Sequence, residues 1–145
     1  DQYRPEDRHY LMIDEAKEVK VGWSTAKQNR SITGGQLQIA GEKFSHGIGT
    51  HAHSEITYDL SGKKFRRFYS MVGHNDGGRD TYLTFEVHVD QEKVFDSGDM
   101  KKGEPAKPLD ISVEGADELK LVVTNGRDGK PEGDHADWGH AFLVK

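Results

Sequence analysis

The sequence predicts an all-β domain, an antiparallel β-sandwich of the jelly-roll type. Apolar and polar residues alternate in several short runs, and the turns between these runs use many of the 17 glycines. Alternation with a two-residue period is typical of strands that bury one face. No stretch has the 3.6-residue period of a long helix, and no long internal repeat occurs. A closed barrel has the same strand pattern and stays an alternative.

Length and composition limit the classes of function. The 145 residues fit one domain, with a core large enough to fold without disulfides. We expect this domain at residues 10–145, and a lead-in or linker remnant at residues 1–9. The net charge of -5 gives no electrostatic reason to expect nucleic acid or an anionic membrane as a partner. There is no cysteine, which excludes disulfides and thiolate metal sites, and no apolar run long enough to span a membrane.

The expected strands are short and follow one another along the whole chain. The first two are expected at residues 10–13 and 19–23, followed by a polar, glycine-containing loop at 24–35. Further strands are expected around Leu37 and Ile39 and at residues 56–60, 65–72, 83–89, 94–95, 109–113, 119–123 and 138–144. The strand at 83–89 alternates without a fault, and we expect it to form a hairpin with 94–95.

Two stretches carry most of the side-chain chemistry. Residues 133–143 contain two carboxylates, two imidazoles and an indole, and residues 47–55 combine small residues with His51, His53 and Glu55. Imidazole, carboxylate and indole groups supply hydrogen bonds and an aromatic surface. We therefore expect these two stretches to meet in a functional site.

The order of these residues resembles the NPCBM family, which is carbohydrate-binding module family 51. The resemblance rests on residues 47–52 and 134–138, with Trp23 and residues 85–87 in matching order, and it covers roughly residues 10 to 145. It implies a galactose-binding-domain-like jelly roll with a structural calcium ion and no catalytic activity of its own. It also implies that the partners are terminal galactose-type glycans and a covalently linked catalytic or surface domain, at an extracellular or cell-surface location.

The sequence departs from the family pattern at two places. Residues 74–76 supply one acid where the family often has consecutive acids, and Gly139 and His140 follow Trp138 in place of a more usual Ala-Asp pair. We expect the sugar preference to respond to these differences.

A neutral sugar presents hydroxyl groups and one apolar face, so its site needs an aromatic platform and fixed polar groups. Each candidate also has a structural alternative. The two tryptophans could belong to the core, His51 could hydrogen-bond the backbone at a turn, and Arg79 could pair with Asp80 at the surface. The candidate ligand-binding residues are Trp23, His51, Glu55, Asn75, Arg79, Asp134, His135 and Trp138.

Calcium prefers oxygen ligands from carboxylates, backbone carbonyls and water. The loop at 128–137 is rich in carboxylates, and the candidate calcium ligands are Asp76, Asp134 and Asp137. The alternative is that these aspartates cap turns, which aspartate does readily.

Two other classes of function stay open. His51, His53 and Glu55 are spaced two residues apart, so on one strand they would share a face and suit zinc or iron in a metalloenzyme. A structural or protein-docking sandwich without sugar binding is the other alternative. The sequence has no cysteine nucleophile, no Gly-x-Ser-x-Gly elbow and no phosphate-binding loop. The main prediction is therefore a non-catalytic carbohydrate-binding module.

Overall fold

The structure is a computed structural model that describes residues 2–130 and 132–145. Within these residues the chain forms short strands and three single-turn 3-10 helices. The strands are β1 Arg8–Tyr10, β2 Glu18–Lys20, β3 Lys27–Gln28, β4 Leu37–Ile39, β5 Glu42–Phe44, β6 Gly47–His51, β7 Ser54–Asp59, β8 Arg67–His74, β9 Tyr82–Val89, β10 Glu92–Asp96, β11 Met100–Lys101, β12 Lys107–Ser112, β13 Glu118–Thr124 and β14 His135–Val144. The helices are η1 Pro5–Asp7, η2 Ile13–Glu15 and η3 Gly126–Asp128.

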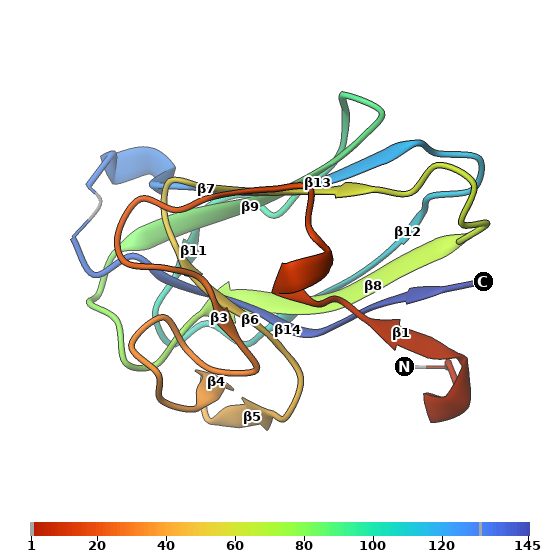
Figure 1. The fold of residues 1–145 in the computed structure, drawn as a ribbon. Coiled ribbons are helices and arrows are strands. Elements are labelled where there is room, and N and C mark those ends of the chain that lie inside the picture. The colour runs from red at the N-terminus through yellow and green to blue at the C-terminus, as the bar shows by residue number, and fades with distance from the viewer. Residues whose placement is uncertain (1, 131) are drawn as a thin grey trace.

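Two antiparallel sheets stack face to face as a β-sandwich, which confirms the predicted fold class (Figure 1). The first sheet has the order β12-β8-β14-β6-β3, and β1 pairs with the far end of β14. The second has the order β10-β9-β13-β7-β2, and β11 pairs with β9. None of the helices in the described part of the chain has the length and apolar character needed to cross a membrane.

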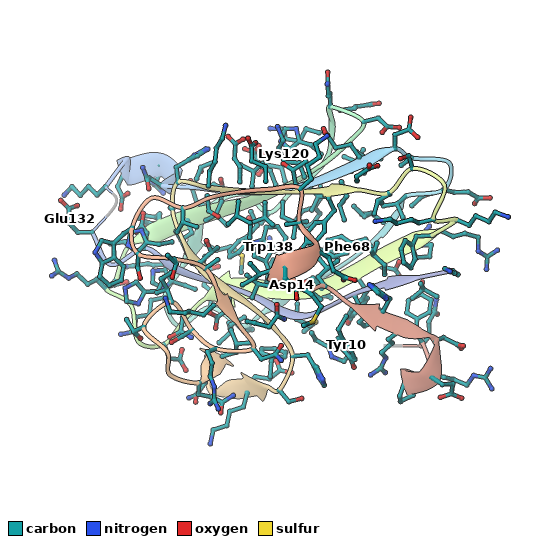
Figure 2. The ribbon with its side chains drawn as sticks, viewed as in Figure 1. Tyr10, Asp14, Phe68, Lys120, Glu132 and Trp138 are labelled. Carbon is teal, nitrogen blue, oxygen red and sulfur yellow. The ribbon has the colours of Figure 1, made fainter. Side chains whose placement is uncertain are left out.

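The core lies between the two sheets and follows the predicted alternation. In β9, Leu83, Phe85 and Val87 point inward and are fully buried. Trp138 of β14 meets them from the other sheet, with its ring edge-on to Phe85 at a centroid distance of 5.1 Å. Figure 2 shows Trp138 and Phe68 between the layers. Burying rings of this size supplies a large part of the hydrophobic stabilisation.

A hairpin of β4 and β5 forms a third layer on the outer face of the first sheet. Its buried residues Leu37, Ile39 and Phe44 make a small separate hydrophobic cluster. The hairpin sits close to the sheet because the sheet presents glycine there: a Cβ on Gly73 would lie 2.5 Å from a methyl carbon of Ile39. This layer covers the outward side chain of Asp137, which is 0% exposed.

The N-terminal strands differ from the prediction. The first strand begins at Arg8 and η2 begins at Ile13, so the expected strand at 10–13 is wrong and the expected domain boundary falls inside β1. The following strand ends at Lys20, which leaves Trp23 in a loop instead of a strand. Strands β1 and β3 belong to the first sheet and β2 to the second, so the chain has to turn before and after β2. These turns interrupt strands that the residue types alone would favour.

The predicted hairpin in the middle of the chain is confirmed. Strand β10 pairs antiparallel with β9. Asp90 and Gln91 form the turn with φ values of 49° and 71°, so two non-glycine residues adopt the left-handed conformation that such a turn requires.

Candidate functional site

A cleft of about 540 Å³ lies at the end of the sandwich where β14 begins. The loop after β2, the loop after β8 and the loop before β14 converge there, and Figure 2 shows Glu132 at this end. The volume falls in the range of small-ligand sites. The lining residues are Gly22, Trp23, His51, Gly77, Arg79, Glu132, Gly133 and His135.

Two histidines form the floor of the cleft. His51 ends β6, His135 begins β14, and the two are direct cross-strand partners, with ring centroids 5.6 Å apart. Nδ1 of His51 lies 2.8 Å from the carbonyl oxygen of Ala52. Because a carbonyl oxygen only accepts, Nδ1 carries the proton, and in the neutral ring Nε2 is an acceptor.

Trp23 forms an apolar wall beside these imidazoles. It is 53% exposed, and its ring is parallel to that of His135 within 3°, at a centroid distance of 6.1 Å. Gly22 allows this placement, because its amide donates to the carbonyl oxygen of His51 and a Cβ there would lie 2.2 Å from the carbonyl oxygen of Ala52. Any larger residue at position 22 would push the tryptophan away from the histidines.

Arg79 lines the cleft beside Gly133. Its amide donates to the carbonyl oxygen of Gly133 at 3.0 Å, and a Cβ on Gly133 would lie 2.3 Å from Cγ of Arg79. The aliphatic part of the Arg79 side chain therefore packs against the backbone of Gly133, where no side chain intervenes. Burial lowers the pKa of His135, and the nearby His51, His74 and Arg79 lower it further. His135 is thus a neutral imidazole at pH 7. Its Nδ1 is buried without a partner among the described residues, so Nε2 is the nitrogen that can donate to or accept from a ligand.

Asp134 lies beneath the cleft and does not line it. It is 0% exposed and accepts a hydrogen bond from the Thr81 hydroxyl, which also contacts Nε2 of His74 at 3.1 Å. Burial raises the pKa of Asp134 to about 6. Its Oδ2 has no hydrogen-bond partner among the described residues. The aspartate supports the loop that carries Gly133 and His135.

Asn75 also has a supporting role. Its Nδ2 donates to the carbonyl oxygen of Gln36 at 3.0 Å and to Oδ2 of Asp137 at 2.7 Å. Its Oδ1 accepts from the amide of Gly77 at 2.8 Å. The side chain links the hairpin layer to the loop after β8, and both amide hydrogens and the amide oxygen take part in these contacts.

The three aspartates predicted as calcium ligands do not converge on one point. Asp76 accepts hydrogen bonds from the amides of Ala40 and Gly41, which is the turn-capping alternative. Asp134 and Asp137 are three residues apart along one extended segment, so their side chains project to opposite faces. Among the residues that the structure describes, no group of three or more His, Cys, Asp or Glu side chains could hold a metal ion.

The calcium ion itself stays a prediction. Asp137 accepts from the amide of Gln38 and from Asn75 through Oδ2, while its Oδ1 is buried without a partner among the described residues. Burial raises the pKa of Asp137 to about 8. One carboxylate with an unpartnered oxygen suits a calcium ion that takes its remaining ligands from backbone carbonyls and water.

The predicted strand face with His51, His53 and Glu55 does not exist. Strand β6 ends at His51 and β7 begins at Ser54, in the other sheet. Nε2 of His53 lies 3.0 Å from Glu55, which is also 3.7 Å from Nζ of Lys120. The metalloenzyme alternative built on one shared face is therefore wrong, and Glu55 lies outside the cleft.

Of the eight predicted ligand-binding residues, the structure brings four to the cleft: Trp23, His51, Arg79 and His135. Trp138 belongs to the core, which is the structural alternative given for it in the sequence analysis. Sequence reasoning missed Gly22, Gly77, Glu132 and Gly133. The only signal for Gly77, Glu132 and Gly133 was their position in glycine-containing loops beside the polar motifs, and Gly22 fell inside the strand expected at 19–23.

The chain is similar to a solved structure of CBM51 from Clostridium perfringens GH95 in complex with methyl-galactose, with a TM-score of 0.87 and 36% identity over 94% of this chain and 99% of that chain. It is also similar to a solved structure of CBM51-2 in complex with GlcNAc and INT domains from Clostridium perfringens ZmpB. The TM-score there is 0.83 and the identity 30%, over 90% of this chain and 30% of that chain.

A curated relative is Alpha-1,3-galactosidase B of Akkermansia muciniphila, 34% identical over 112 residues. The match covers 76% of this chain and only 14% of that protein, so the chain spans a small part of its relative. The sequence model of the NPCBM/NEW2 domain matches residues 8–144. The chain belongs to the NPCBM/NEW2 domain family.

Proposed function

We propose that this chain is a non-catalytic carbohydrate-binding module whose cleft takes a terminal galactose-type sugar. One observation carries the proposal: an exposed indole, Trp23, stands beside the paired imidazoles of His51 and His135. This combination matches the apolar face and the hydroxyl groups of a pyranose. The methyl-galactose bound to the CBM51 of Clostridium perfringens GH95, at 36% identity, supports the choice of sugar.

In this proposal the apolar face of the sugar packs against Trp23. Nε2 of His51 accepts a hydrogen bond from one hydroxyl, the neutral His135 donates or accepts with another, and the Arg79 guanidinium donates to a third. A shallow site with one stacking contact and a few hydrogen bonds gives dissociation constants of roughly millimolar to micromolar, about 4 to 8 kcal/mol.

The cleft supports binding without catalysis. Among the described residues its lining contains a single carboxylate, Glu132, whereas glycoside hydrolysis uses a pair of carboxylates on either side of the scissile bond. A weak site is useful when it is tethered, because linkage to a catalytic or surface domain raises the effective concentration of the substrate. We accordingly place the module in a larger extracellular or cell-surface protein that acts on galactose-type glycans.

A calcium ion is a separate part of the proposal. We take Asp137 as its side-chain ligand, because its Oδ1 is buried and unpartnered among the described residues, a property that Oδ2 of Asp134 shares on the opposite face of the segment. An ion bound there would hold β14 and the β4–β5 hairpin together, since Asp137 contacts Gln38 of that hairpin. The expected result is a higher melting temperature with calcium than with a chelator. Equal melting temperatures would contradict the calcium site and leave the sugar site untouched.

The test of the sugar site is a calorimetric titration of galactose, with glucose as the control that differs only in the orientation of the C4 hydroxyl. We expect heat of binding with galactose and a weaker response, or none, with glucose. His51→Ala should reduce galactose binding more than Arg66→Ala, an exposed substitution outside the cleft. Equal losses in both variants, or equal binding of both sugars, would contradict the proposed site.

A further inference from the structure

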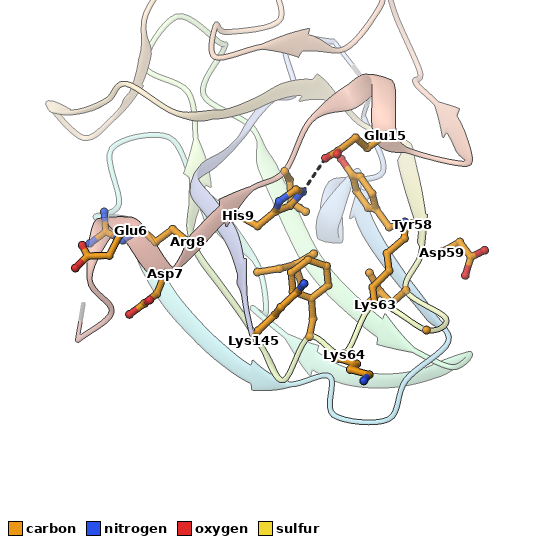
Figure 3. A pocket seen from close by; sticks show the side chains of 15 residues that line it. Glu6, Asp7, Arg8, His9, Glu15, Tyr58, Asp59, Lys63, Lys64 and Lys145 are labelled. Carbon is orange, nitrogen blue, oxygen red and sulfur yellow. Dashed lines mark hydrogen bonds and ion pairs between the residues drawn. The ribbon is translucent and has the colours of Figure 1, made fainter.

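A second cleft, of about 600 Å³, lies at the other end of β14. Its walls are β1 and the segment that follows it, the turn after β7, and the last residues of the chain around Leu143 and Lys145 (Figure 3). The described residues that line it are all different from those that line the Trp23 cleft. Because β14 is ten residues long, the two clefts are roughly 30 Å apart.

Three lysines of this second cleft carry charges without ion-pair partners. Among the described residues, Lys63, Lys64 and Lys145 have no carboxylate within salt-bridge distance. All three lysines belong to the lining, and Figure 3 shows their side chains below His9. Ammonium groups that share a cleft and have no ion-pair partner favour an anionic ligand.

The acids of the same lining are already occupied. Glu6 and Asp7 lie 3.6 and 3.3 Å from Nε of Arg4, and Glu15 contacts Nε2 of His9 at 2.9 Å. Oδ1 of Asp59 accepts hydrogen bonds from the amide and the hydroxyl of Ser61, which lower the pKa of Asp59. Asp59 has no cation within salt-bridge distance among the described residues, although the charge of Lys63 also lowers its pKa. Figure 3 shows its carboxylate turned away from His9 and Lys145, so the unpaired charges on that side of the cleft are the ammonium groups.

The turn after β7 fixes two of the lysines. The amide of Lys63 donates to the carbonyl oxygen of Leu60 at 3.1 Å, and Gly62 has a φ of 73°. Lys64 has a φ of 63°, a left-handed conformation that is uncommon for a residue with a Cβ. This tight turn presents both side chains from the same edge of the cleft.

The cleft also has the parts that a sugar ring requires. Phe65 is a partly buried ring with Nζ of Lys145 5.6 Å from its centroid and the His9 ring 5.4 Å away. The polar His9–Glu15 pair faces the cleft beside it (Figure 3). An aromatic surface next to a carboxylate and an imidazole suits the apolar face and the hydroxyls of a pyranose.

We propose that this cleft is a second glycan-binding site, for a sugar ring that bears an anionic group. The ring packs against Phe65, hydroxyls contact the His9–Glu15 pair, and Lys63, Lys64 and Lys145 bind the anion. A uronic acid and a sulfated hexose share this chemistry. Two sites roughly 30 Å apart on one rigid sandwich would engage two points of a branched or densely displayed glycan, which strengthens binding by avidity.

The test is an NMR titration of the isotope-labelled chain with galacturonate, galactose 6-sulfate, galactose and inorganic sulfate in parallel. We expect at least one of the two anionic sugars to shift the amide signals of residues 60–65 and His9, while galactose and inorganic sulfate leave them in place. Shifts with galacturonate would identify a carboxylate as the recognised group, and shifts with galactose 6-sulfate would identify a sulfate. Equal shifts with inorganic sulfate, or no shifts at these residues with either anionic sugar, would overturn the proposal.

Variants separate this site from the first. Lys63→Gln should weaken binding of the anionic sugar about tenfold, the loss expected for one charged hydrogen bond. Lys43→Gln, an exposed lysine of β5 outside the cleft, should leave it unchanged. Trp23→Ala should abolish the response to galactose and spare the response at residues 60–65. If Trp23→Ala abolishes both responses, the second site does not exist.

Discussion

The two tryptophans of this chain occupy opposite environments. Trp23 is 53% exposed in the loop after β2, and Trp138 is 0% exposed in the core. Trp138 takes an inward position of β14, in register with the buried Ile48 and Val72 of the neighbouring strands. Trp23 follows Gly22 past the end of its strand, where contact with the β6–β7 corner holds it beside His51.

A related division separates the polar residues that line the cleft from those that lie outside its lining. His51, His135 and Arg79 line the cleft, although His51 is only 5% exposed. Asn75, Asp134 and Asp137 are buried outside the lining, and their side chains are bonded to the backbone, to Thr81 or to one another. Residues of the first group should act on ligand affinity, and residues of the second group on stability. This contrast yields predictions that can be ranked by size.

The largest effect is expected in the core. Trp138→Ala should lower the free energy of unfolding by about 3 to 5 kcal/mol, because it leaves a cavity opposite Phe85. Urea denaturation measures this loss, and Trp138→Phe, which keeps a ring, should lose less. A loss below about 1 kcal/mol for the alanine variant would show that the packing described for Trp138 is wrong.

The second effect separates affinity from stability. Trp23→Ala should leave the free energy of unfolding within about 0.5 kcal/mol of the wild-type value, because the residue is exposed. The same change should weaken galactose binding by at least about tenfold, since it removes the stacking surface. Calorimetry measures the affinity, and Trp23→Phe should retain part of it. Unchanged affinity in the alanine variant would remove Trp23 from the site.

The third effect concerns the buried Asp137 and the pH dependence of the free energy of unfolding. In calcium-free protein the pKa of Asp137 is about 8, against an ordinary value of 3.8. Between about pH 4 and 8 the folded state therefore holds more protons than the unfolded state, so the free energy of unfolding falls as pH rises. Asp137→Asn keeps an oxygen that can accept from Gln38 and Asn75.

Denaturation at several pH values with a chelator present measures this slope. Asp137→Asn should flatten the profile and should also remove any stabilisation by calcium. A profile that is equally steep in both proteins would mean that Asp137 is ionised in the fold.

The smallest effect is expected for Glu55. It pairs with His53 and Lys120 on the second sheet, outside the cleft, and a partly exposed ion pair contributes little. Glu55→Gln should leave galactose affinity unchanged and alter the free energy of unfolding by less than about 1 kcal/mol. A clear loss of affinity in this variant would mean that the binding surface extends past the β6–β7 corner.

The sequence predicts the scaffold better than it predicts the site, and the reason is physical. Alternation places Leu83, Phe85 and Val87 in the core because strand geometry fixes which side of the sheet each residue faces. The same geometry misleads at His51 and Glu55, because the alternation continues across a corner where the chain passes from one sheet to the other.

The rim of the cleft depends on contacts between segments distant in sequence. Gly22 against Ala52 and Gly133 against Arg79 are close approaches of this kind. A glycine in a loop does not reveal which backbone it will touch, so the lining glycines could not be assigned from the sequence. The histidines and Trp23 could be proposed because their side chains suit a sugar, whichever loops bring them together.

The most direct test of the account follows the two indole N–H signals by NMR while methyl-galactose is titrated into the chain. Trp23 and Trp138 supply one signal each, so the core tryptophan serves as an internal control for the cleft tryptophan. The account predicts a saturable shift of the Trp23 signal and a stationary Trp138 signal. A stationary Trp23 signal, or equal movement of both, would contradict a sugar-binding cleft at Trp23.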